Sequence, residues 1–94
     1  MNDIETKTND IETKIRNFIF ENFLIGQSGY VLKNDVSFLD EGIIDSTGIL
    51  ELVAFIEDTY GIVVEDEELI PDNLDSINNI TAYLKKKIWP DSND

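Results

Sequence analysis

With 94 residues, the chain is the size of one small domain. It has 20 Asp and Glu residues against 7 Lys and Arg residues, a formal net charge of −13, and it contains neither His nor Cys. These two absences exclude a nucleophile activated by an imidazole, a zinc or iron–sulfur site with His or Cys ligands, and a disulfide. The negative charge argues against nucleic acid and anionic membrane surfaces as direct partners.

The remaining composition is that of a folded protein, because hydrophobic residues make up 41% of the chain. No apolar run approaches the roughly 20 residues that a membrane-spanning helix needs, so no membrane span is expected. The first residues are acidic and polar, unlike a secretory signal. We therefore expect a soluble, cytoplasmic and monomeric protein.

The N-terminus contains a short repeat, in which the hexapeptide NDIETK occurs at residues 2–7 and again at residues 9–14. Each copy is typical of a helix start, with Asn as N-cap and Glu three residues later. We expect the second copy to begin a helix over residues 10–24 and residues 1–9 to form a frayed extension. An apolar stripe of Ile11, Ile15, Phe18 and Ile19 faces the core, and Gly26 follows the helix as a stop signal.

A long connection is expected from there to about residue 44, held to the core by Val36, Phe38 and Leu39. So long a loop is unusual in a small domain and is often functional. The second helix begins at Asp45 or Ser46 as N-cap and runs to residue 60, where a glycine stops it. Its predicted core face consists of Ile49, Leu50, Leu52, Val53, Phe55 and Ile56.

The last third of the chain is predicted to hold an extended link over residues 62–64 and a short helix over residues 65–70, ended by Pro71. Asp75 or Ser76 then caps a final helix with Ile77, Ile80, Leu84 and Ile88 on one face. Residues 89–94 are expected to form a disordered tail. The predicted fold is all-α, a small bundle of three main helices plus one short helix, with a long loop between helices 1 and 2.

The charge is unevenly distributed, because no basic residue occurs between Lys33 and Lys85. Residues 40–75 hold the acidic residues Asp40, Glu41, Asp45, Glu51, Glu57, Asp58, Glu65, Asp66, Glu67, Glu68, Asp72 and Asp75. Such a run can be a solvated surface that aids solubility. Because all the charged side chains in this run are negative, a docking surface is favoured, since a uniformly negative field speeds association with a basic partner.

Two other uses of the carboxylates fit poorly. A calcium loop that starts at Asp40 would need Gly at its sixth position, where Asp45 stands, and oxygen ligands where Gly42 and Ile44 stand. We therefore expect no dedicated metal site, and weak, non-specific binding of a divalent cation is the alternative. A carboxylate pair for acid–base catalysis would need a deep cleft, for which a bundle this small has little room, so no enzymatic activity is expected.

Ser46 lies at the junction of the long loop and the second helix. One interpretation is that Ser46 or Asp45 simply caps the helix. The other is that an exposed Ser at a helix N-terminus carries a phosphodiester, because free N–H groups and the helix dipole favour an anion there. With no His in the chain to activate it, Ser46 would be modified by another enzyme.

Residues 38–62, FLDEGIIDSTGILELVAFIEDTYGI, resemble the central segment of acyl carrier proteins. The similarity continues through residues 65–69 and 76–84, and residues 10–88 are expected to form the carrier domain. In that family the Ser of an Asp-Ser pair carries 4′-phosphopantetheine, whose terminal thiol holds the cargo as a thioester. The resemblance implies that Ser46 is the attachment site and that the sulfur missing from the chain arrives with the cofactor.

The resemblance also implies a surface on which Arg and Lys residues of partner enzymes dock. The implied docking residues are Asp45, Thr47, Glu51, Glu57, Asp58, Asp66 and Glu67. The implied partners are a phosphopantetheinyl transferase, a ligase or transferase that loads acyl or aminoacyl groups, and downstream synthase enzymes of fatty acid or polyketide biosynthesis. An apolar cargo would insert between the helices. The candidate residues to line its pocket are Ile49, Val53, Phe55, Ile62 and Ala82. The alternative role of each of these residues is packing in the core.

Three positions depart from the usual family pattern. Thr47 stands where a Leu commonly meets partner enzymes, and Glu65 replaces a frequent Pro. Gly48 makes the motif Asp-Ser-x-Gly, which is similar to D-alanyl carrier proteins and some stand-alone carriers. These departures leave the cargo open between acyl and aminoacyl groups. The alternative function is an unmodified acidic helical adaptor that binds a basic protein.

Overall fold

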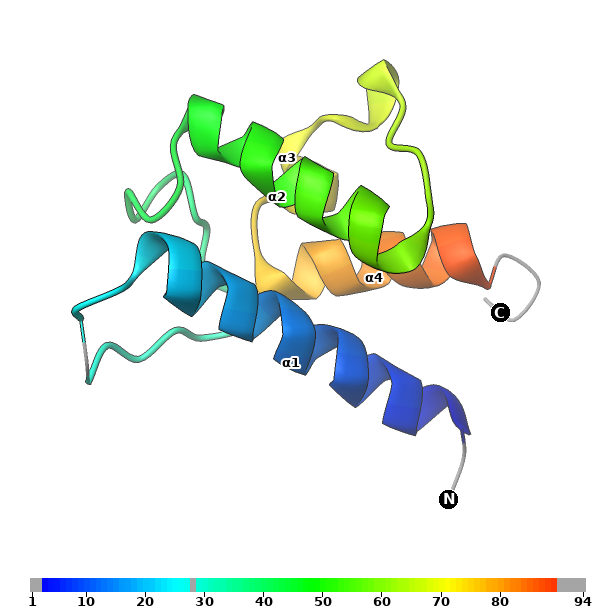
Figure 1. The fold of residues 1–94 in the computed structure, drawn as a ribbon, viewed down its shortest axis with the longest axis horizontal. Helices are drawn as coiled ribbons and strands as arrows, with labels where there is room; N and C mark the ends of the chain where they lie inside the picture. The colour runs from blue at the N-terminus through cyan, green and yellow to red at the C-terminus, as the bar shows by residue number, and fades with distance from the viewer. Residues whose placement is uncertain (1–2, 28, 90–94) are drawn as a thin grey trace.

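The computed structural model describes residues 3–27 and 29–89, with side chains from Lys7 onward, and its regular structure over these residues is helical (Figure 1). The elements are α1 (Asp3–Phe23), α2 (Ser46–Tyr60), the 3-10 turn η1 (Asp66–Glu68), the single-turn α3 (Pro71–Leu74) and α4 (Ile77–Ile88). This confirms the predicted all-α bundle of three main helices and a short one. No helix among the described residues has the length and apolar character needed to cross a bilayer.

Helix α1 begins at Asp3, so the predicted start at residue 10 was wrong. A capping signal inside a sequence is only a preference worth about 1 kcal/mol, and a helix that already runs through Thr8 satisfies the following N–H groups without it. Ile11, Ile15 and Ile19 are buried as predicted. The domain limits at residues 10 and 88 stay a prediction, and most of the predicted tail, residues 90–94, lies outside the described residues.

The core lies where α1, α2 and α4 meet, and α4 contacts both α1 and α3. Its fully enclosed side chains are Ile15, Ile19, Phe38, Ile44, Leu52, Ile56, Leu74, Ile77, Ile80 and Leu84. Leu50 was expected on the core face of α2 but is 61% exposed. With 3.6 residues per turn it lies about 200° around the helix from Leu52, on the solvent side.

The connection between α1 and α2 is held to the bundle by polar contacts as well as by apolar burial. The guanidinium of Arg16 donates to the carbonyl oxygen of Leu32 and to Oδ1 of Asn34. The carbonyl oxygen of Asn34 in turn accepts from the N–H of Asn78 at 2.9 Å. Phe38 is fully buried as predicted, whereas Leu39, also expected to hold the loop to the core, is exposed.

The short helical segment differs from its prediction. The link predicted over residues 62–64 contains neither helix nor strand, Glu65 is extended, and η1 occupies only three of the residues predicted to be helical. Pro71 begins α3 instead of ending a helix. The reason is that the first N–H of a helix needs no partner and the ring of proline presets a helical φ, so proline suits a first position.

Glu68 joins η1 to α4 through three donors. Its carboxylate accepts from the N–H of Glu65 at 2.9 Å, from the hydroxyl of Tyr83 at 2.9 Å and from Nζ of Lys87 at 3.1 Å. Three hydrogen bonds lower the pKa of Glu68 below its ordinary value of 4.5. The bond from the N–H of Glu65 has the largest effect, and the bonds from Tyr83 and Lys87 have smaller effects. Burial and the hydrogen bond to Glu68 raise the pKa of Tyr83.

Replacing Glu68 with Gln should lower the melting temperature, and the loss should depend on pH. Because the pKa of Glu68 is lower in the folded chain, its stabilising effect is complete above pH 4.5 and is lost as the pH falls through the folded pKa. The melting temperatures of parent and variant should therefore differ at pH 7 and converge below pH 4.5. Glu67→Gln is the matched control, because Glu67 is an exposed neighbour; the same pH profile for both variants would contradict the assignment.

Candidate functional site

Ser46 is the first residue of α2, and its neighbour Asp45 caps the helix. Oδ1 of Asp45 accepts a hydrogen bond from the N–H of Gly48 at 2.7 Å, while the backbone of Asp45 is extended. Of the two residues considered for the cap, the structure therefore selects Asp45. The Ser46 side chain is exposed, and its hydroxyl has no hydrogen-bond partner among the described residues. The capping role does not account for this serine.

Gly48 allows α2 to pack closely against the preceding segments. A Cβ at this position would lie 2.8 Å from Cε1 of Phe23, 2.9 Å from Cγ2 of Ile44 and 3.3 Å from Oδ1 of Asp45. Gly48 is buried, and its backbone has an ordinary helical φ. A glycine is therefore needed here because there is no room for a side chain, and not because the backbone is unusual. The sequence indicates Gly48 only as part of a motif, because no local pattern shows which side chain will lie across from it.

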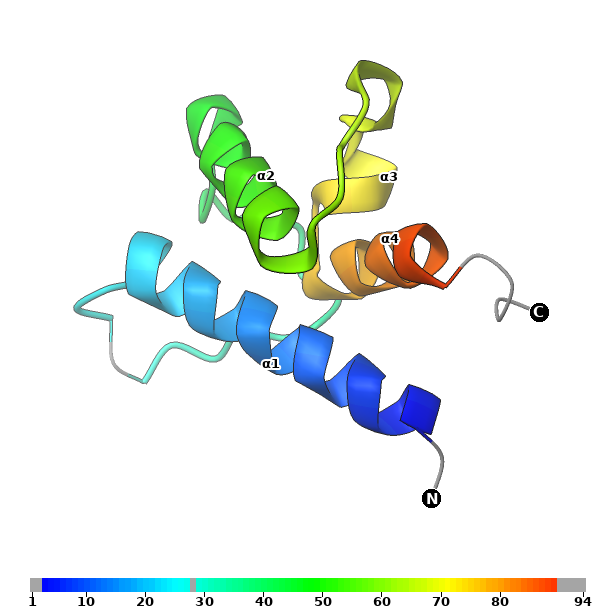
Figure 2. The same ribbon diagram turned by 45° about the vertical axis from the view of Figure 1, so that its right-hand side comes forward.

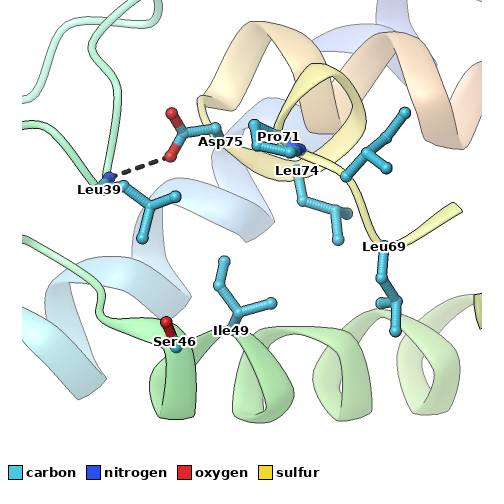
Figure 3. Close-up of a pocket in the computed structure, with 8 residues that line it drawn as sticks. Leu39, Ser46, Ile49, Leu69, Pro71, Leu74 and Asp75 are labelled. Carbon is cyan, nitrogen blue, oxygen red and sulfur yellow. Dashed lines mark hydrogen bonds between the residues drawn. The ribbon is translucent and has the colours of Figure 1, made fainter.

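The end of the long loop is held by Asp75, which lies between α3 and α4. The carboxylate of Asp75 accepts from the hydroxyl of Ser37 and, at 3.0 Å, from the N–H of Leu39 (Figure 3). The backbone of Phe38 donates to the carbonyl oxygen of Asp75 at 2.8 Å. Sequence reasoning considered Asp75 only as a cap of the last helix, a role that Ser76 fills by accepting from the N–H of Asn79 at 3.0 Å.

A small cavity lies beside Ser46, between the start of α2 and the segment that contains α3. Figure 3 shows Ser46 and Ile49 rising from α2 toward this space, with Leu39, Leu69 and Leu74 around it. Its volume is about 170 Å³, and its lining residues are Leu39, Ser46, Ile49, Leu69, Ile70, Pro71, Leu74 and Asp75. The cavity is mainly apolar, with the Ser46 hydroxyl and the Asp75 carboxylate as its polar side-chain groups.

Only one of the five residues considered for a cargo pocket lines this cavity, namely Ile49. Val53 and Ile62 are half-buried elsewhere and pack against the core, and Ala82 is exposed. Phe55 faces a different depression, between α1 and α2. Helical spacing alone could not identify the other lining residues, because most come from the segment of residues 69–75 that folds back over α2.

The acidic residues implied for docking are distributed over α2 and η1. Asp45, Thr47, Glu51, Asp58, Asp66 and Glu67 are all exposed. Glu57 is half-buried, and its Oε2 accepts from the N–H of Val64 at 2.9 Å, so this carboxylate holds the extended link against α2. Over residues 7–27 and 29–89, whose side chains the structure describes, no group of three or more acidic side chains is arranged to hold a metal ion.

Curated proteins similar to this chain are carrier proteins. The acyl carrier protein of Buchnera aphidicola subsp. Schizaphis graminum is 34% identical over 87 residues, which are 93% of this chain and 96% of that protein. The D-alanyl carrier protein of Abiotrophia defectiva is 30% identical over 54 residues, 57% of this chain and 68% of the relative. The acyl carrier protein of Rhodococcus erythropolis is 40% identical over 52 residues, 55% of each chain. No family model matches the chain.

The close contact at Gly48 predicts that Gly48→Ala destabilises the fold. A methyl group would overlap Phe23 and Ile44, and overpacking of this kind costs about 1–3 kcal/mol. Urea unfolding should show that loss in the free energy of unfolding. Thr47→Ala, an exposed position one residue away, should stay within about 0.5 kcal/mol of the parent. Equal stability of the two variants would mean that α2 moves away from Phe23 at no cost.

Proposed function

The chain belongs to the acyl carrier protein family, and on that premise we propose that it carries an acyl or aminoacyl group as a thioester on 4′-phosphopantetheine attached to Ser46. The relatives are carrier proteins, so the chain is a carrier and not an enzyme. One observation carries the choice of residue. Asp45 provides the cap of α2, which leaves the Ser46 hydroxyl exposed and unpartnered at the first position of the helix.

The surroundings of Ser46 fit a phosphodiester. The N–H groups of Gly48 and Ile49 are bound to Asp45, whereas those of Ser46 and Thr47 have no acceptor among the described residues. Free N–H groups in the first turn of a helix favour an anion at that end. The reactive group of the arm, when attached, is a thiol that holds the cargo, which accounts for a carrier that has no Cys of its own.

The attachment is a substitution at phosphorus in which Ser46 is the nucleophile. Its Oγ forms the new P–O bond to the phosphopantetheine half of coenzyme A, and the bond to adenosine 3′,5′-bisphosphate breaks. The proton of the Ser46 hydroxyl passes to a base of the transferase, because no described side chain of this chain is hydrogen-bonded to that hydroxyl. The part played by this chain is to present an exposed hydroxyl on a rigid helix end.

The cavity beside Ser46 supports a small cargo. Its volume of about 170 Å³ is similar to that of an engineered protein cavity of about 150 Å³ that binds benzene. Ile49, Leu69 and Leu74 give it apolar walls, which favour a short acyl chain or a small amino-acid side chain. A cargo held there would lie against these apolar side chains between visits to partner enzymes.

The exposed carboxylates of α2 support docking of partner enzymes with basic surfaces. Glu51 and Asp58 are exposed, and no Lys or Arg occurs between residues 34 and 84 to neutralise them. A one-signed surface of this kind raises the association rate of a basic partner. Glu57 contributes less, because its carboxylate is engaged by the N–H of Val64.

Modification of Ser46 is the direct test of the proposal. The intact mass should increase by one phosphopantetheine after incubation with coenzyme A, Mg²⁺ and a broad-specificity phosphopantetheinyl transferase. Ser46→Ala should show no increase, whereas Thr13→Ala, which removes an exposed hydroxyl of α1, should be modified like the parent. No increase in a folded parent with several transferases would overturn the proposal and favour the acidic adaptor.

The docking charges should affect the rate of this modification. Glu51→Lys and Asp58→Lys should each slow modification by the transferase by about tenfold at low ionic strength, and added salt should reduce the difference. Asp35→Lys changes the net charge equally but lies in the long loop, so it should retain the parent rate. Equal slowing by all three variants would assign the effect to net charge and not to a docking surface.

A further inference from the structure

The cavity beside Ser46 has one charged group in its otherwise mainly apolar wall, the carboxylate of Asp75. The segment that contains η1 and α3 lies opposite α2 (Figure 2), and Asp75 follows α3 as its C-cap. Leu39, Ile49 and Leu74 supply hydrocarbon side chains around the cavity, whereas Asp75 supplies a negative charge. The carboxylate therefore gives the cavity a means to distinguish between small cargoes of similar shape.

The Asp75 carboxylate has no positively charged partner among the residues whose side chains are described, 7–27 and 29–89. Its hydrogen bonds come from two neutral donors, the hydroxyl of Ser37 and, at 3.0 Å, the N–H of Leu39. None of the residues that line the cavity is a Lys or an Arg. An ionised carboxylate has about four acceptor sites, so these two bonds leave it able to accept further donors.

These features select the class of cargo. An unsubstituted acyl chain in the cavity would displace water from the carboxylate and offer no hydrogen bond in return, which is unfavourable. An anionic group would be repelled by the same charge. An ammonium group brings the opposite charge and up to three donors, so it can pair with Asp75 while the rest of the cargo lies against the apolar wall.

The size of the cavity restricts the cargo further. A volume of about 170 Å³ holds a small group and not a long chain. In an aminoacyl thioester the α-ammonium group is attached to the carbon next to the carbonyl group. An amino acid with a short side chain therefore places its charge and its apolar part within the same small space.

We propose that Asp75 is a specificity-determining residue that favours an aminoacyl cargo, whose α-ammonium group pairs with the Asp75 carboxylate in the cavity beside Ser46. The inference rests on the proposed function, because it decides between the acyl and aminoacyl cargoes that the proposed function leaves open. It gives Asp75 a second role besides its hydrogen bonds to Ser37 and Leu39.

The test uses the unmodified protein and three small amides, the N-methylamides of L-alanine, L-lactic acid and isobutyric acid. They carry an ammonium, a hydroxyl or a methyl group at the same carbon, at about pH 6.5 where an α-amino group is protonated. NMR titration at low ionic strength should show saturable shifts in the methyl signals of Ile49, Leu69 and Leu74. The alanine amide should bind about two- to fivefold more tightly than the other two, the ratio expected for a solvent-accessible ion pair. Equal binding of the alanine and lactic acid amides would overturn the proposal.

Variants separate recognition by Asp75 from the general attraction of cations to an acidic protein. Asp75→Asn should abolish the preference for the alanine amide. Asp72→Asn, an equal change of charge at an exposed residue of α3 that does not line the cavity, should keep it. Ser37→Ala removes a loop contact of Asp75 but leaves the carboxylate, so it should also keep the preference. Loss of the preference in all three variants would contradict the assignment to Asp75.

A measurement on the parent protein covers the case in which Asp75→Asn fails to fold. The side-chain carboxyl carbon signal of Asp75 should shift with the alanine amide and not with the isobutyric acid amide; no shift with the alanine amide would contradict the site. The titration needs no transferase, so failure of Ser46 modification would not affect it. Absence of the ammonium preference would likewise leave the attachment of phosphopantetheine to Ser46 standing.

Discussion

The attachment of Phe38 and its neighbours to Asp75 is the constraint on which the geometry around Ser46 depends. The backbone N–H of Phe38 donates to the carbonyl oxygen of Asp75, and the carboxylate of Asp75 accepts from Ser37 and Leu39. The carbonyl oxygen of Phe38 in turn accepts from the N–H of Ile43 at 2.8 Å. These bonds join the end of the long loop to the α3–α4 junction, and Phe38 fills the core beneath them. The start of α2 is thereby placed opposite the segment with which it forms the cavity.

Helix α2 has different chemistry on its different sides. The side toward residues 69–75 carries Ser46 and Ile49 and is mainly apolar, while the side toward α1 carries Phe55 between Glu51 and Asp58. Asp45 and Gly48 make this division possible, because the first frees the serine from capping and the second lets the helix lie close to Phe23. The proposed carrier role would use both sides, the first for the cargo and the second for partner enzymes.

The excess of carboxylates lowers the stability of the fold through mutual repulsion. Among residues 7–27 and 29–89, whose side chains are described, one ion pair is present, between Lys87 and Glu68, and it belongs to the contact between η1 and α4. The remaining carboxylates of α2 are either exposed, as are Glu51 and Asp58, or used locally, as is Glu57. Exposed like charges repel one another and do not hold the bundle together. Apolar burial must therefore supply the stability, and the surface charge stays available for basic partners.

Local sequence patterns were sufficient to predict the helices with strong periodicity and to single out Ser46 as the candidate site. The spacing of Ile11, Ile15 and Ile19 and of Ile77, Ile80 and Leu84 predicted two buried faces, because helix periodicity is a local property. The start of α1 and the role of Pro71 were wrong, since capping and proline signals are compatible with more than one boundary. Three features follow from the packing of the whole chain and not from local patterns: the residues opposite Ser46, the need for a small residue at position 48, and the contact between Phe18 and Phe55. Those contacts join segments far apart in the sequence, and their distances depend on how the whole chain packs.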